Sequence, residues 1–140
     1  LTARNADGEP FAEELQPLRV VMGTSEIPTD AKVFLPPGHA LHVQTRDVRT
    51  ALDELWNHDV RTLLVEGGSQ VAAAFLRAGV VDEVQYYAAP AMLGAGVASL
   101  RDGTNILGRT MGDIRRFVPR ELQVFGNDVR WTMTAPGRTP

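Results

Sequence analysis

The residues best suited to chemistry lie in the segment LLVEGGSQ, residues 63–70, where an apolar run meets two glycines and then a helical pattern. Gly67 and Gly68 allow the backbone to approach a ligand closely, because neither residue carries a Cβ atom. The helix predicted after them offers unpaired amides and the positive end of its dipole. This combination favours a phosphate or pyrophosphate ligand, although a plain strand-to-helix turn has the same pattern.

Two other segments add polar groups at the carboxyl ends of predicted strands, where parallel sheets bind ligands. Glu66 ends the apolar run, and its carboxylate could bind a substrate amine or amide, or could form only a salt bridge. Thr45 and Arg46 follow a second strand-like segment. The forked guanidinium binds two phosphate oxygens at once, so this pair could hold the 2′-phosphate of NADP, whereas a lone arginine there is more often only solvated.

A second glycine-rich segment, LGAGVAS at residues 93–99, imitates a dinucleotide-binding fingerprint. Gly94 and Gly96 have the required spacing, but Ser99 replaces the third glycine. Loop-forming residues follow, where a true fingerprint needs a helix. We therefore expect no classical Rossmann site in this segment.

Composition narrows the possible classes of protein. The 140 residues carry a formal net charge of −3, which does not favour binding to polyanions. The chain has no cysteine, so disulfides, thiolate metal sites and cysteine nucleophiles are excluded, and its three histidines lack metal-ligand spacing. We expect no metal site. No apolar run is long enough to span a membrane and no signal peptide is visible, so we expect a cytoplasmic protein.

Periodicity predicts the elements that position these residues. Residues 18–22, 40–45, 60–66 and 82–89 are predicted strands, and the third is apolar enough to be central. Asp47 is predicted to cap a helix whose apolar face is formed by four residues. They are Val48, Ala51, Leu52 and Leu55.

A second helix is predicted over residues 69–78, with Gly79 as its stop. Its predicted apolar face is Val71, Ala74, Phe75 and Ala78. Residues 114–125 and 129–134 are expected to form a closing β-hairpin around the turn 126–128. The resulting order predicts an α/β fold with a mostly parallel central sheet, a C-terminal antiparallel hairpin and a single domain over residues 1–140.

Several blocks of the sequence resemble a known family in the right order. The segment LLVEGGSQVAAAFLRAGVVDEVQYYAAPAMLGAG, with QPLRVVMG and IPTDAKVF upstream, closely resembles the C-terminal reductase domain of the bifunctional riboflavin-biosynthesis deaminase–reductase. The resemblance implies a dihydrofolate-reductase-like three-layer fold and pairing into a homodimer. It also implies reduction of 5-amino-6-(5-phosphoribosylamino)uracil, with NADPH giving a hydride to C1′ of the opened ribose imine.

The resemblance also implies roles for individual residues. Gly67, Gly68 and Ser69 would contact the NADPH phosphates, and Thr45 and Arg46 would lie near the 2′-phosphate. Glu66 would face the substrate, and Arg4 with Asn5, in the segment LTARN, would bind the substrate phosphate. The cofactor wall would be shaped by Pro90, Leu93, Gly94 and Gly96. No residue is assigned as a catalytic acid or base.

Two departures from the family pattern affect these expectations. Gly23 stands where family members often carry Asp, which would move a substrate contact to Thr24 or Ser25. The family domain also opens with a strand and a helix before the part matched here, so we expect the 140-residue chain to be N-terminally truncated and to turn over poorly alone. Two alternatives stay open: reduction of the related 2,5-diamino-pyrimidinone phosphate, or a non-catalytic remnant that binds nucleotide or dimerises.

Overall fold

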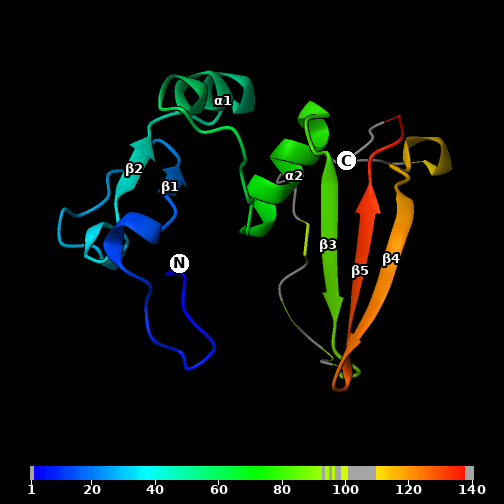
Figure 1. Ribbon diagram of the computed structural model, residues 1–140. Helices are drawn as coiled ribbons and strands as arrows, with labels where there is room; N and C mark the ends of the chain where they lie inside the picture. Colours follow the sequence, from blue (N-terminus) through cyan, green and yellow to red (C-terminus); the bar gives the residue numbers. More distant parts are fainter. Residues whose placement is uncertain (1, 93, 95, 97–98, 101–109, 138–140) are drawn as a thin grey trace. The chain divides into compact units, whose positions relative to one another are not determined.

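The computed structural model describes residues 2–92, 94, 96, 99–100 and 110–137 (Figure 1). The chain divides into two compact units, Leu1–Leu63 and Leu64–Pro140. Each unit has its own sheet and one α-helix. The predicted single domain stays a prediction, and each unit is described by itself.

The first unit is built on two short parallel strands, β1 (Arg19–Met22) and β2 (Ala40–Val43), which confirm the first two predicted strands. Helix α1 (Val48–Asn57) follows β2 and begins at the predicted cap. Short 3₁₀ turns at Glu13–Leu15 and Lys32–Phe34 lie in the connections.

One face of the β1–β2 pair packs against α1. Val43 on β2 is fully buried and forms a core with Ala51 and Leu55 of the helix. Partly buried apolar side chains surround this core: Val20, Met22, Leu41, Val60 and Leu63. Because alternate strand residues face opposite sides, Arg19, Val21 and His42 lie on the other face.

The second unit consists of α2 (Ser69–Ala78) and an antiparallel sheet of β3 (Glu83–Ala88), β4 (Val118–Phe125) and β5 (Asp128–Thr134). The strand order is β3-β5-β4, with the predicted hairpin joining β4 to β5 (Figure 1). Gly79 ends α2 in the left-handed conformation, with φ of 69°, as predicted. Ala73 and Phe75 are the buried residues of α2, so the inner face is turned slightly from the predicted one.

The sheet of the second unit has chemically different faces. Residues paired across neighbouring strands share a face, so Tyr86, Trp131 and Leu122 form one apolar row. The same face carries five other apolar residues: Val84, Ala88, Val124, Val129 and Met133. The opposite face carries Glu83, Gln85, Glu121, Gln123, Arg130 and Thr132, with Tyr87.

The predicted third strand, residues 60–66, is wrong. No described strand pairs with this segment, and Leu64 is 76% exposed. An apolar run supplies side chains for a sheet, but a strand also needs a partner for its amides and carbonyls. The pairing of β3 also differs from the expected parallel sheet, because β3 runs antiparallel to β5 and only β1 and β2 are parallel.

None of the helices in the described part of the chain has the length and apolar character to cross a bilayer.

Candidate functional site

The start of α2 is open to a ligand. Gly68 precedes the helix, and no described side chain caps it; its first turn holds no acidic residue. No described atom lies within 4 Å of where a Cβ atom on Gly67 or Gly68 would stand. The peptide between these glycines is cis, and Gly67 has φ of 120°. Among the described residues, this helix start thus lacks a side-chain cap and is uncrowded at both glycines, two features that favour an external acceptor.

The start of α1 is different, because a side chain of the protein already occupies it. The carboxylate of Asp47 accepts hydrogen bonds from the Thr50 amide, at 2.8 Å, and from the Thr50 hydroxyl, at 2.9 Å. Chiefly because of the bond from the Thr50 amide, the pKa of Asp47 lies below its usual value. The Thr50 amide is therefore already satisfied, so of these two helix starts that of α2, which has no described side-chain cap, is better suited to a pyrophosphate.

Thr45 and Arg46 lie between β2 and α1, at the carboxyl end of the parallel pair. The Thr45 hydroxyl accepts a hydrogen bond from the Asp47 amide at 3.0 Å, and its own proton stays available to a ligand oxygen. The Arg46 side chain is exposed and forms no hydrogen bond or ion pair with the residues that the structure describes. Arg46 is thus a guanidinium that is available for an external anion.

One backbone oxygen joins this corner to the end of β1. The carbonyl of Val43 accepts hydrogen bonds from Gly23, at 3.1 Å, and from Thr45, at 2.8 Å. The segment after β1 therefore begins beside the predicted binding pair. Sequence reasoning placed Thr45 and Arg46 but did not detect this connection.

Arg4 and Asn5 build a local loop. The Asn5 side-chain oxygen accepts from the amides of Asp7 and Glu9, and Arg4 donates to the Gly8 carbonyl at 2.7 Å. Asn5 is thus occupied as a loop organiser, whereas Arg4 keeps further guanidinium donors and an exposed side chain. Their predicted contact with a substrate phosphate stays a prediction.

The remaining predicted residues belong to the second unit. Glu66 is exposed and directly precedes the two glycines, with Ser69 as the first residue of α2. Pro90 follows the end of β3, and Gly94 and Gly96 lie in the connection after it. Leu93 lies outside the described residues. The structure thus brings together Glu66, Gly67, Gly68 and Ser69 in one unit, and Thr45, Arg46 and Gly23 in the other.

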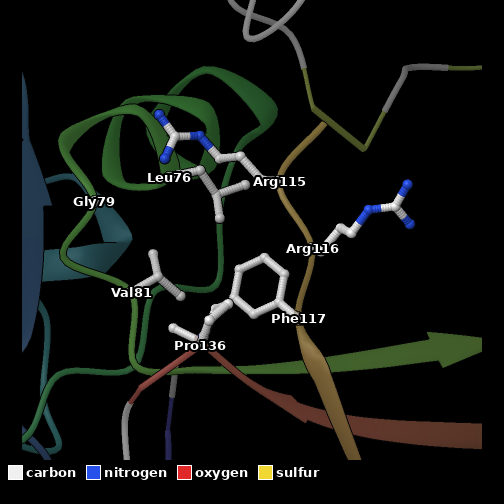
Figure 2. Close-up of a pocket in the computed structure, with 8 residues that line it drawn as sticks. Leu76, Gly79, Val81, Arg115, Arg116, Phe117 and Pro136 are labelled. Carbon is white, nitrogen blue, oxygen red and sulfur yellow. The ribbon is translucent and has the colours of Figure 1, made fainter. Parts of the chain in front are cut away.

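A cavity of about 280 Å³ lies near the opposite end of α2 and contains none of the predicted site residues (Figure 2). Its lining includes Leu76, Val81, Phe117 and Pro136. Arg115 lies over Leu76 and donates to the Arg77 carbonyl at 3.3 Å, whereas Arg116 points away from the cavity. Arg115 therefore places a positive charge at the negative end of the helix dipole, which stabilises the end of α2.

Several known proteins are similar in sequence to this chain. The chain matches the model of the RibD C-terminal domain over residues 1–130. It is 39% identical over 102 residues to riboflavin biosynthesis protein RibD of Mycobacterium tuberculosis strain H37Rv, a match that covers 73% of this chain and 29% of that protein. For the protein of the same name from Corynebacterium ammoniagenes, the identity is 38% over 100 residues, with 71% and 29% covered. The chain thus spans less than a third of these relatives.

Solved structures confirm the predicted α/β, dihydrofolate-reductase-like fold class. RibD of Acinetobacter baumannii, form 2, matches with a TM-score of 0.70 at 24% identity, over 86% of this chain and 38% of that one. A Thermotoga maritima protein described as a diaminohydroxyphosphoribosylaminopyrimidine deaminase/5-amino-6-(5-phosphoribosylamino)uracil reductase matches with a TM-score of 0.67 at 19% identity. This match covers 96% of the present chain and 40% of that protein.

Proposed function

The chain belongs to the RibD C-terminal domain family of riboflavin biosynthesis, and we propose that it carries the NADPH-binding part of a cytoplasmic reductase. The substrate we propose is 5-amino-6-(5-phosphoribosylamino)uracil, and the product is its ribitylamino counterpart. The similar Thermotoga maritima protein is described as including a reductase of this substrate. The chain spans less than a third of the length of the RibD relatives described above, so the activity of the whole protein is part of this proposal.

The observation that carries the proposal is the uncapped start of α2 behind two glycines. The protein places its own carboxylate at the start of α1 but no described side chain at the start of α2. A helix start favours an anion by about 0.3–1 kcal/mol when the site is exposed. Space at both glycines would also let a bulky pyrophosphate approach the backbone.

Different predicted site residues would bind the cofactor and the substrate. The backbone at Gly67, Gly68 and Ser69 would hold the pyrophosphate, and Thr45 with Arg46 would bind the 2′-phosphate. The exposed carboxylate of Glu66 would accept a hydrogen bond from an amine or amide of the pyrimidine, and Arg4 would pair with the substrate phosphate.

NADPH would supply a hydride to C1′ of the opened ribose imine, and a proton would go to the adjoining nitrogen. The protein would contribute mainly by positioning the two reactants, because the hydride chemistry resides in the cofactor. Pro90, Leu93 and Gly94 would form part of the cofactor wall.

We propose that the chain forms a homodimer in which the apolar face of the second unit's sheet is the interface. Tyr86, Trp131 and Leu122 on this face are 51%, 45% and 65% exposed. A contiguous apolar surface of this kind is typical of an interaction site. A second copy would remove it from water.

Titration of the chain with NADPH and NADH by calorimetry tests the proposal. We expect NADPH to bind and NADH, which lacks the 2′-phosphate, to bind about tenfold or more weakly. If neither nucleotide binds, the proposed cofactor site is wrong, and the alternative of a non-catalytic remnant that only dimerises is favoured. Turnover of the two candidate pyrimidines by the full-length protein would then identify the substrate.

A further inference from the structure

His42 is a polar residue of β2 that the proposed function has not used. It lies on the face of the β1–β2 pair opposite α1 and is partly buried. Its ring Nε2 lies 2.8 Å from the carbonyl oxygen of Gly23. Since a carbonyl can only accept, the ring must carry its proton on Nε2 to form this hydrogen bond.

Both polar backbone groups of Gly23 are therefore engaged. Its amide donates to the Val43 carbonyl at 3.1 Å, and its carbonyl accepts from His42 at 2.8 Å. Gly23 has φ of 154°, and the exposed residues Thr24 and Ser25 follow it. The direction in which the chain leaves β1 is consequently set by two bonds to β2, one of them from a side chain.

The same Val43 oxygen also accepts the amide of Thr45 at 2.8 Å. The segments 23–25 and 44–46 are thus both hydrogen-bonded to the Val43 carbonyl oxygen. They follow the carboxyl ends of neighbouring parallel strands. Three hydroxyls and a guanidinium belong to these segments: Thr24, Ser25, Thr45 and Arg46. Hydroxyl and guanidinium donors suit the oxygens of a phosphate monoester.

We propose that His42 is a positioning residue for a phosphate-monoester corner, in which Thr24 and Ser25 join Thr45 and Arg46 around the 2′-phosphate of NADPH instead of contacting the substrate. This inference rests on the proposed function. His42 contacts no ligand and acts through Gly23, because its ring holds the carbonyl after which the Thr24–Ser25 segment begins. Without that donor, the segment keeps only the Gly23 amide bond and loses its fixed direction.

Three variants of the chain test the proposal. His42→Leu removes the donor while keeping an apolar body, and His42→Gln restores a side-chain N–H. His39→Leu is the matched control, because His39 is exposed and only its backbone carbonyl, which accepts from the Arg19 amide, is engaged in the described structure.

Two measurements are made on each variant: the ratio of NADH to NADPH dissociation constants, and the amide NMR spectrum of residues 23–25 without ligand. We expect His42→Leu to lower the ratio about threefold to tenfold and to broaden or shift the free-state amides. His42→Gln should recover most of both, and His39→Leu should change neither. A simple loss of sheet stability would weaken both nucleotides alike and leave the ratio unchanged.

The NMR measurement separates failure of this inference from failure of the proposed function. If NADPH does not bind the wild-type chain, the proposed function fails, and the free-state amides still report whether His42 orders the segment. If NADPH binds and His42→Leu keeps the wild-type ratio, the positioning role is wrong. Should His42→Leu fail to fold, the pair Thr24→Val and Ser25→Ala must lower the ratio by itself, and an unchanged ratio overturns the proposal.

Discussion

The carboxylate of Asp47 lies 2.8 Å from the amide of Thr50, so α1 begins with its own anion in place. The pKa of Asp47 is lowered, first by this bond and then by the Thr50 hydroxyl. A carboxyl with a lowered folded-state pKa stabilises the fold above its unfolded-state pKa and loses that effect as pH falls through the folded value.

We therefore expect Asp47→Ala to lower the melting temperature near neutral pH. The deficit should shrink as the pH falls below the ordinary range of an aspartate carboxyl, because protons then bind the unfolded chain more readily than the folded cap, and it should vanish once the cap itself is protonated. Asp47→Asn is the control, since asparagine caps helices well without titrating. Thermal unfolding followed by circular dichroism from pH 7 to pH 3 measures the difference; a constant deficit across this range would contradict the assignment.

Replacing Gly68 with Asp tests the open start of α2. The new carboxylate would cap the helix and repel a pyrophosphate, and space exists for its Cβ atom. We expect Gly68→Asp to bind NADPH about tenfold or more weakly than Gly68→Ala, which carries the same backbone change without the charge. Calorimetry gives both dissociation constants, and equal values for the two variants would place the pyrophosphate elsewhere.

Arg46 is expected to select NADPH over NADH. Arg46→Ala should weaken NADPH binding about tenfold, because a charged hydrogen bond to a phosphate contributes about 1.5–3 kcal/mol, and should leave NADH binding nearly unchanged. Arg49→Ala is the matched control, since Arg49 is also exposed and lies in the first turn of α1. A similar loss for both nucleotides would show that Arg46 does not read the 2′-phosphate.

The proposed homodimer can be tested at the apolar face of the second unit's sheet. Trp131→Glu places a charge in the middle of this face, and we expect it to convert a dimer into a monomer in analytical ultracentrifugation. Gln123→Glu adds the same charge on the opposite, polar face and should keep the wild-type mass. If the wild-type chain sediments as a monomer, the proposed homodimer is wrong.

Elements governed by local sequence could be predicted. Asp47 as a cap and Gly79 as a stop fixed the helix ends, because capping and left-handed conformations depend on the residue itself. The turn at residues 126–128 was equally clear. The segment 60–66 could not be judged in this way, since its strand state depends on partners that a residue pattern does not identify.

The candidate site was only partly visible in the sequence for a similar reason. Gly67 and Gly68 could be predicted as phosphate-binding residues because glycine has no side chain. Arg46 could be predicted as a phosphate ligand because it follows a strand. The contact between His42 and Gly23 joins residues 19 positions apart and depends on the register of two parallel strands. The substrate-phosphate contact of Asn5 stays a prediction, and the pattern did not indicate that its side-chain oxygen also accepts from the amides of Asp7 and Glu9.

The alternation of side chains along β5 has a consequence for the tolerance of the hairpin to insertions. The side-chain period of a strand is two, so a slip of one residue between β4 and β5 would turn Arg130 and Thr132 toward the apolar side and expel Trp131 and Met133 from it. The irregularity between Pro119 and Glu121 already absorbs one extra residue near the far end of the ladder. An insertion that shifts the β4–β5 register by one residue would therefore exchange the two surfaces, whereas one that shifts it by two would preserve them.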